Sequence, residues 1–99
     1  MTATDVINET RAYVIENFLY MRRDPFLADE DLLIRQRVID SIGVVELVQF
    51  IEDRFGVHLE NDEITEENIG SLAAIARFVV RKKTVGILDL ERERLRLPA

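Results

Sequence analysis

Residues 40–56 read DSIGVVELVQFIEDRFG, and the spacing of their apolar residues indicates the kind of fold. These apolar residues recur at three- and four-residue spacings, which place them on one face of an α-helix. Asp40 or Ser41 supplies a cap at the start, and Gly56 supplies a stop. The stretch therefore predicts a helix over 41–55 with a buried face of Val44, Leu47, Val48, Ile51 and Phe55.

Further helices are predicted on both sides of this stretch. The segment 4–20 contains neither glycine nor proline, and its apolar residues have helical spacing. Thr65 and Gly70 predict the two ends of a short helix, and Ser71 predicts the cap of the last one. The cations at 81–83 are expected at the C-terminus of that last helix. The predicted buried residues are Ile7, Val14, Phe18 and Met21 in the first helix and Leu72, Ile75, Ala76 and Val79 in the last.

The connection 22–39 interrupts the helical pattern with Asp24-Pro25 and an acidic run at 29–31. A loop of this length inside a compact domain needs a functional or packing reason. Here the loop leads to Ser41, and its apolar residues are expected to pack against the core and hold the loop in place. These expected anchors are Phe26, Leu27, Leu32, Leu33 and Ile34.

The predicted fold class is all-α, a bundle of three main helices and one short helix with a long loop between the first two. Residues 1–83 are expected to form one domain, since 99 residues allow a single core. The tail 84–99 alternates leucines with a Glu-Arg-Glu-Arg run at 91–94. A solvated helical extension, packing back on the bundle and disorder all remain open for this tail.

Composition excludes several kinds of protein. There is no cysteine and a single histidine, so a thiolate nucleophile, a disulfide framework and a cysteine-based metal site are excluded. The 19 acidic residues outnumber the 13 basic ones, and residues 1–80 carry 16 acids against 7 bases, which disfavours nucleic acid as a partner. With no signal-peptide pattern and no membrane-spanning run, we expect a cytoplasmic protein that is not inserted in a membrane, and a monomer.

Ser41 is the strongest candidate for a residue that takes part in chemistry. It places a hydroxyl at the N-terminus of an amphipathic helix, directly after a long exposed loop. A phosphodiester formed there would lie near unpaired backbone N–H groups and the positive end of the helix dipole. On spacing alone, however, a purely structural cap explains this serine equally well, because serine and aspartate are common N-cap residues.

The predicted helix 41–55 also carries a second, exposed face. Ile42 and Val45 fall off the buried stripe, and acidic or polar residues surround them. An apolar patch with an acidic border is typical of a docking surface for basic proteins. The expected partner-recognition residues are Asp40, Ile42, Val45, Glu46, Gln49, Glu52 and Asp53.

The segments DSIGVVELV at 40–48 and IEDRFGV at 51–57 resemble the signature of acyl carrier proteins. The resemblance covers roughly residues 1–83, including the TEEN turn at 65–68 and the start of the last helix at Ser71. It implies that a phosphopantetheinyl transferase attaches 4'-phosphopantetheine from coenzyme A to Ser41. It further implies that Asp40 and Glu46 help recognition, and that the chain is a carrier without catalytic activity of its own.

The implied function is to shuttle a thioester-bound acyl intermediate between a ligase or synthase and downstream acyl-transfer enzymes. Three residues depart from the family pattern: Ile42 replaces leucine, Gly43 replaces an acidic or polar residue, and Arg37 stands where many members have glycine. The less acidic face favours a specialised pathway over general fatty-acid synthesis. The run is also similar to D-alanyl carrier proteins and to stand-alone aminoacyl or pyrrolyl carriers, so the cargo is open between these classes.

The functional predictions for other residues are less specific. His58 is expected to line the following loop or to face solvent, and Phe50 to pack in the core rather than wall a cargo cavity. The carboxylate pairs at 62–63 and 66–67 lack the spacing of a calcium loop. An unmodified interaction module remains a second hypothesis, and an enzyme is a third. A catalytic serine would need a base, and His58, the single histidine, is the one candidate.

Overall fold

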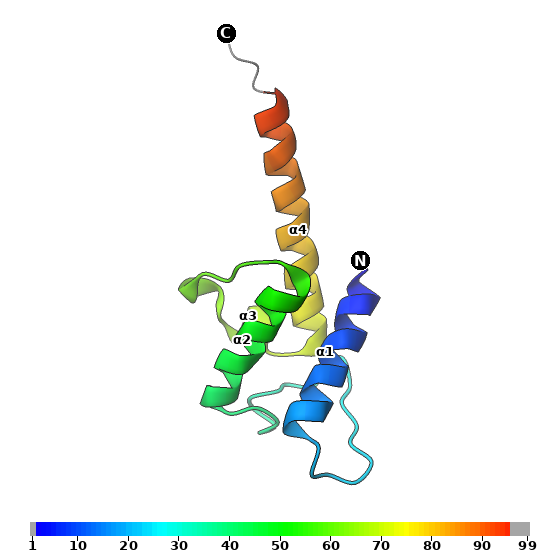
Figure 1. The fold of residues 1–99 in the computed structure, drawn as a ribbon. Coiled ribbons are helices and arrows are strands. Elements are labelled where there is room, and N and C mark those ends of the chain that lie inside the picture. The colour runs from blue at the N-terminus through cyan, green and yellow to red at the C-terminus, as the bar shows by residue number, and fades with distance from the viewer. Residues whose placement is uncertain (1, 96–99) are drawn as a thin grey trace.

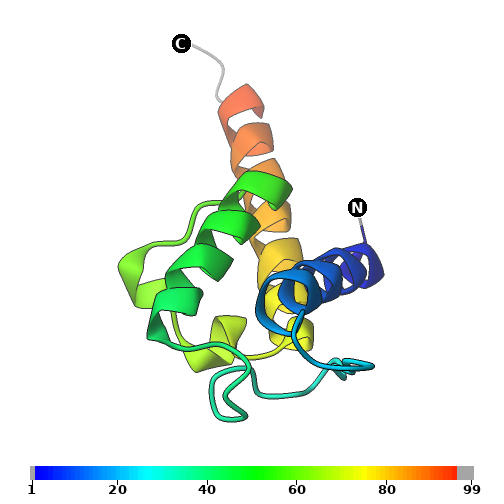
Figure 2. The same ribbon diagram turned by 60° about the horizontal axis from the view of Figure 1, so that its bottom comes forward.

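The computed structural model describes the backbone of residues 2–95 and the side chains of residues 2–86. Over this range it is all-helical, which confirms the predicted fold class (Figure 1). The elements in chain order are α1 (Ala3–Phe18), α2 (Ser41–Phe55), the 3-10 turn η1 (Asn61–Glu63), α3 (Glu66–Ile69) and α4 (Leu72–Leu95). In Figure 2, α1 and α2 flank the first half of α4, and the connection 19–40 runs along the lower end of the bundle.

Helix α1 begins with a capping box in which the side chains of Thr2 and Asp5 bond each other's backbone amides. The predicted end at residue 20 was wrong, because α1 ends at Phe18 and the chain turns there. The side chain of Leu19 enters the core, whereas that of Met21, a predicted core residue, is 84% exposed. The buried stripe of α1 is Val6, Thr10 and Val14.

Two leucines anchor the long connection. Leu27 and Leu33 are buried. The prediction that Phe26 and Ile34 are also anchors was wrong, because these residues are 81% and 42% exposed. Backbone hydrogen bonds complete the attachment: the amide of Leu33 donates to the carbonyl of Gly70 over 2.8 Å, and the amide of Ala73 donates to that of Asp29 over 2.9 Å. These bonds order the connection because they satisfy polar groups that would otherwise be buried without partners.

Helix α2 has the predicted bounds. Asp40 is its N-cap and Gly56 its C-cap, and the φ of 67° at Gly56 is a left-handed conformation that suits glycine. Leu47, Ile51 and Phe55 face the core. The cap of α3 at Thr65 is likewise as predicted.

Helix α4 is longer than the sequence indicates. Arg81, Lys82 and Lys83 were predicted at its C-terminus, but they lie near its middle, and the helix continues to Leu95. The first half is buried against α1 and α3, with Phe78 and Val79 among its core residues. The second half extends beyond the other helices (Figure 1). Of the three possibilities for the tail, residues 84–95 take the helical one, and residues 96–99 lie outside the described residues. None of the described helices has the length and hydropathy needed to cross a membrane.

Candidate functional site: the N-terminus of α2

Asp40 and Ser41 have separate roles at the start of α2. The carboxylate of Asp40 accepts a hydrogen bond from the backbone amide of Gly43 over 2.8 Å, so aspartate is the cap. Ser41 is the first residue of the helix, and it is exposed. Its hydroxyl makes no hydrogen bond to any residue that the structure describes. The purely structural explanation of Ser41 as a cap is therefore removed.

Ser71 is the only other serine in the sequence, and its hydroxyl, unlike that of Ser41, serves as a helix cap. Its side chain is buried, and its hydroxyl accepts a hydrogen bond from the amide of Ala74 over 3.1 Å. It is the cap that the sequence predicted for α4. One serine is thus committed to structure, while Ser41 presents a free hydroxyl to solvent.

The surroundings of Ser41 suit an anion. Asp40 engages the amides of Gly43 and Val44, through its side chain and its carbonyl respectively, which leaves the first two amides of α2 at the positive end of its dipole. Beside them is an open hollow of about 330 Å³ whose lining is both charged and apolar. Its lining residues are Phe18, Arg37, Val38, Asp40, Ile42, Gly43 and Glu46. Arg37 and the free amides would suit the anionic phosphodiester of a phosphopantetheine group, and Phe18, Val38 and Ile42 would suit its partly apolar arm, whereas the carboxylates of Asp40 and Glu46 oppose the anion.

Arg37 and Gly43, two of the residues at which the sequence departs from the acyl carrier signature that it resembles, have structural consequences. Arg37 has a φ of 57°, a left-handed conformation that favours glycine, so the arginine is held there at a conformational cost. At Gly43, an added Cβ would lie 2.8 Å from both the Phe18 ring and the Ile39 side chain. Gly43 therefore lets the end of α1 pack closely against the start of α2.

The second face of α2 is exposed largely as predicted. Ile42 is 74% exposed and Val45 is 70% exposed, and the side chains of Glu46, Gln49 and Asp53 are exposed around them. Glu52 differs from the prediction. Its carboxylate accepts a hydrogen bond from the amide of Leu59 over 2.9 Å and pairs with His58, so it holds the following loop. Glu52 is only partly exposed, unlike Glu46, Gln49 and Asp53.

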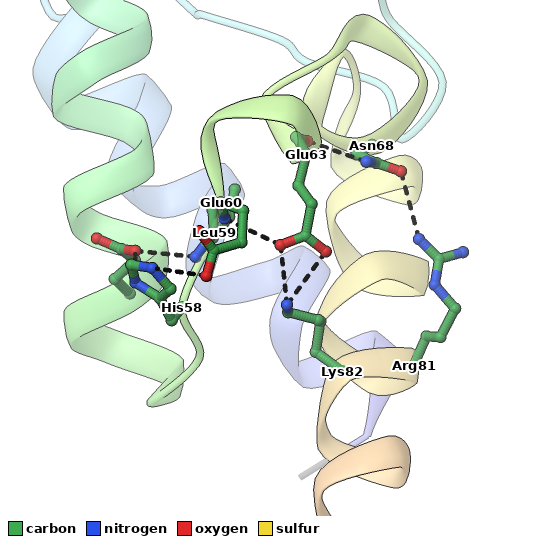
Figure 3. A network of polar contacts seen from close by, with 8 residues as sticks. His58, Leu59, Glu60, Glu63, Asn68, Arg81 and Lys82 are labelled. Atoms are coloured by element: carbon green, nitrogen blue, oxygen red, sulfur yellow. Dashed lines mark hydrogen bonds and ion pairs between the residues drawn. The ribbon is translucent and has the colours of Figure 1, made fainter.

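A polar network fixes the segment between α2 and α3 (Figure 3). His58, 72% exposed, lies between the carboxylates of Glu52 and Glu60, 2.9 Å and 3.4 Å from its ring nitrogens. Lys82 donates to both carboxylate oxygens of Glu63, over 2.9 Å and 3.1 Å. The hydrogen bond from the Glu60 amide and the bond from Lys82 lower the pKa of Glu63. Glu60 and Glu63 thus have a structural role.

An open groove of about 690 Å³ lies between α1 and α2, and the sequence did not predict it. Phe50 stacks on Tyr13, with ring centroids 4.1 Å apart and planes 3° from parallel, and it contacts Phe55 edge-on. Phe50 therefore packs in the α1–α2 interface and also lines this groove. Burial, with a smaller contribution from the charge of Glu46, raises the pKa of Tyr13.

No group of three or more candidate ligands capable of holding a metal ion occurs among the described residues. No protein-family model matches the chain, and no curated protein matches its sequence.

Proposed function

We propose that this chain is an acyl carrier protein that bears 4'-phosphopantetheine on Ser41 and shuttles a thioester-bound acyl group between partner enzymes. The observation that carries the proposal is the exposed, unbonded hydroxyl of Ser41 beside an aspartate that already caps the helix. The resemblance of residues 40–57 to the carrier signature points to the same hydroxyl.

The chain's own residues have simple roles in this proposal. Ser41 provides the oxygen to which a phosphopantetheinyl transferase joins the arm from coenzyme A. The first turn of α2 stabilises the resulting phosphodiester through its amides and dipole. When bound, the arm supplies a terminal thiol that holds the cargo as a thioester. Ile42, Val45 and Glu46 contact the transferase, the loading ligase or synthase, and the downstream enzymes.

The cargo belongs to a specialised pathway in this proposal, such as one for a secondary metabolite or a modified lipid. The exposed face of α2 is less acidic than a general fatty-acid carrier would require, because Gln49 contributes no charge and Arg54 contributes a positive one. An aminoacyl or D-alanyl carrier is the alternative, and the similarity of DSIGVVEL at 40–47 and IEDRF at 51–55 to such carriers favours it. Loading the modified protein with fatty acyl and with aminoacyl groups by matching ligases distinguishes these cargoes.

An unmodified interaction module is the second candidate, and the exposure of Ile42 and Val45 favours it. A serine hydrolase has little support. Ser41 begins α2, whereas His58 lies beyond its other end, which separates them by roughly 20 Å along the helix axis. His58 is also held between two glutamates. The histidine is therefore out of reach as a base for Ser41.

Incubation with coenzyme A and several phosphopantetheinyl transferases, followed by intact-protein mass spectrometry, tests the proposal. We expect the wild type to gain the mass of one phosphopantetheine group and Ser41→Ala to gain none. A lack of any gain with all transferases would favour the unmodified interaction module instead.

A further inference from the structure

Arg37, near the end of the connection 19–40, is an exposed cation whose side chain makes no hydrogen bond or ion pair with any residue in the range 2–86. It nevertheless lines the open hollow beside the start of α2, together with the carboxylates of Asp40 and Glu46. Its guanidinium therefore pairs with neither carboxylate of its own hollow. A guanidinium in this position is available to an anion that comes from outside the chain.

The backbone at Arg37 belongs to a hydrogen-bonded turn. The amide of Arg37 donates to the carbonyl of Ile34 over 3.0 Å, and the amide of Val38 donates to that of Leu33 over 2.8 Å. Leu33 is buried, so the turn is fixed to the core. The turn sets the φ of Arg37 to 57°, where glycine would be more favourable. The position thus carries a guanidinium at a conformational cost that no polar contact of its side chain with the described residues offsets.

The hollow adjoins the proposed attachment point. Ser41 is exposed and lies between Asp40 and Ile42, both of which line the hollow. A phosphodiester on Ser41 would be anionic, and the carboxylates of Asp40 and Glu46 would oppose it. Arg37 is the one side-chain cation in this lining. Its planar fork of N–H donors matches two oxygens of a phosphate, which a point charge does not.

Apolar side chains complete the wall of the hollow. Phe18 reaches it from the end of α1, and Val38 and Ile42 reach it from either side of the α2 cap. The Phe18 ring is close to the first turn of α2, because a Cβ at Gly43 would lie 2.8 Å from it. An arm held at its phosphate by Arg37 would therefore have an apolar surface to lie on instead of extending into solvent.

We propose that Arg37 is a positioning residue for the arm, whose guanidinium pairs with the phosphodiester on Ser41 and directs the arm along the hollow toward Phe18. This inference rests on the proposed carrier function, because it needs the group on Ser41. It adds a docked state of the unloaded arm, from which a partner enzyme must release it. The pair is exposed, so the docked state is reversible and is weakened by salt.

Arginine side-chain NMR of the phosphopantetheinylated protein tests the pairing directly. The Nε–H signal of Arg37 in ¹⁵N-labelled protein is recorded before and after modification, which intact-protein mass spectrometry verifies. We expect this signal to shift on modification and to move back at about 1 M NaCl, where the Debye length is about 3 Å. The signal of Arg35, which already pairs with Glu66, should stay in place. Nuclear Overhauser effects from the two methyl groups of the arm to the Phe18 ring should appear.

Variants of two arginines in the connection complete the test. Arg37→Gly removes the guanidinium and should stay folded, since glycine suits the φ of 57°. It should weaken the Overhauser effects between the arm and Phe18 about 2- to 5-fold, the range for an exposed charge pair. Arg37→Lys keeps the charge without the planar fork and should retain part of them. Arg23→Gly removes the same side chain outside the hollow and should leave them unchanged.

The outcomes separate this inference from the carrier function. A modified Ser41 with an unmoved Arg37 signal would overturn the role of Arg37 and leave the carrier function intact. Equal Overhauser effects in Arg37→Gly and Arg23→Gly would do the same. A protein that no transferase modifies would overturn both proposals.

Discussion

The carboxylate of Asp40 accepts a hydrogen bond from the backbone amide of Gly43 over 2.8 Å, and this bond leaves the neighbouring Ser41 hydroxyl without a structural task. Asp40→Ala should therefore lower the free energy of unfolding by about 1 kcal/mol, the usual loss for an N-cap. Ser41→Ala should change it by less than about 0.5 kcal/mol. Urea unfolding of both variants checks this difference.

A loss of stability in Ser41→Ala as large as in Asp40→Ala would show that the serine is structural after all. Ser71→Ala is the positive control, because its hydroxyl caps α4 within the core. It should be destabilised by about 1 kcal/mol or more.

Gly43 should resist replacement by alanine. A Cβ at this position would lie 2.8 Å from both Phe18 and Ile39. Overpacking of this kind costs about 1–3 kcal/mol, which exceeds the gain in helix propensity of at most about 1 kcal/mol. We expect a lower melting temperature for Gly43→Ala, together with shifted NMR signals from the Phe18 ring.

Gly86 provides the matched control within α4, because a Cβ there would have nothing within 4 Å. Gly86→Ala should stabilise the helix by up to about 1 kcal/mol. If both alanine variants were equally stable, close packing at Gly43 would not explain that glycine.

The hydrogen bond from the Glu60 amide and the ion pair with Lys82 together lower the pKa of Glu63, and they should make stability depend on pH in the acid range. The folded state lowers the pKa of Glu63 relative to the unfolded chain, so the stabilisation is complete above the unfolded pKa, about 4.3. It is lost as the pH falls through the lower, folded pKa. Glu63→Gln should be less stable than the wild type at pH 7, and the two should converge in acid. Chemical unfolding at a series of pH values measures this convergence.

Asp62→Asn is the control for this pH series, since Asp62 makes no hydrogen bond or ion pair with the residues described. It should follow the wild type throughout. A constant difference between Glu63→Gln and the wild type at every pH would mean that the charge of Glu63 does not contribute.

Local signals in the sequence predicted much of this structure. Both ends of α2 follow from Asp40 and Gly56, and the start of α4 follows from Ser71, because caps act within a few residues. The end of α1 was missed because Leu19, Tyr20 and Met21 continue an apolar helical pattern past the turn. The length of α4 was missed because the cations at 81–83 were read as an end signal, while the helix continues through Gly86.

Features that depend on long-range contacts could not be predicted. Phe26 and Leu27 are adjacent and both apolar, and only the packing of the connection determines that Leu27 is the buried one. The Tyr13–Phe50 stack requires the pairing of α1 with α2. The helical position of Glu52 predicts an exposed residue, but the chain returns at Leu59, whose amide donates to the Glu52 carboxylate.

The most direct test of the central claim is to locate the attached group. The protein is incubated with coenzyme A and a phosphopantetheinyl transferase, digested, and analysed by tandem mass spectrometry. We expect one phosphopantetheine group on the peptide that contains Ser41 and none on the peptide that contains Ser71. An unmodified Ser41 peptide under conditions that fully modify a known carrier, or a group found on another residue, would contradict it.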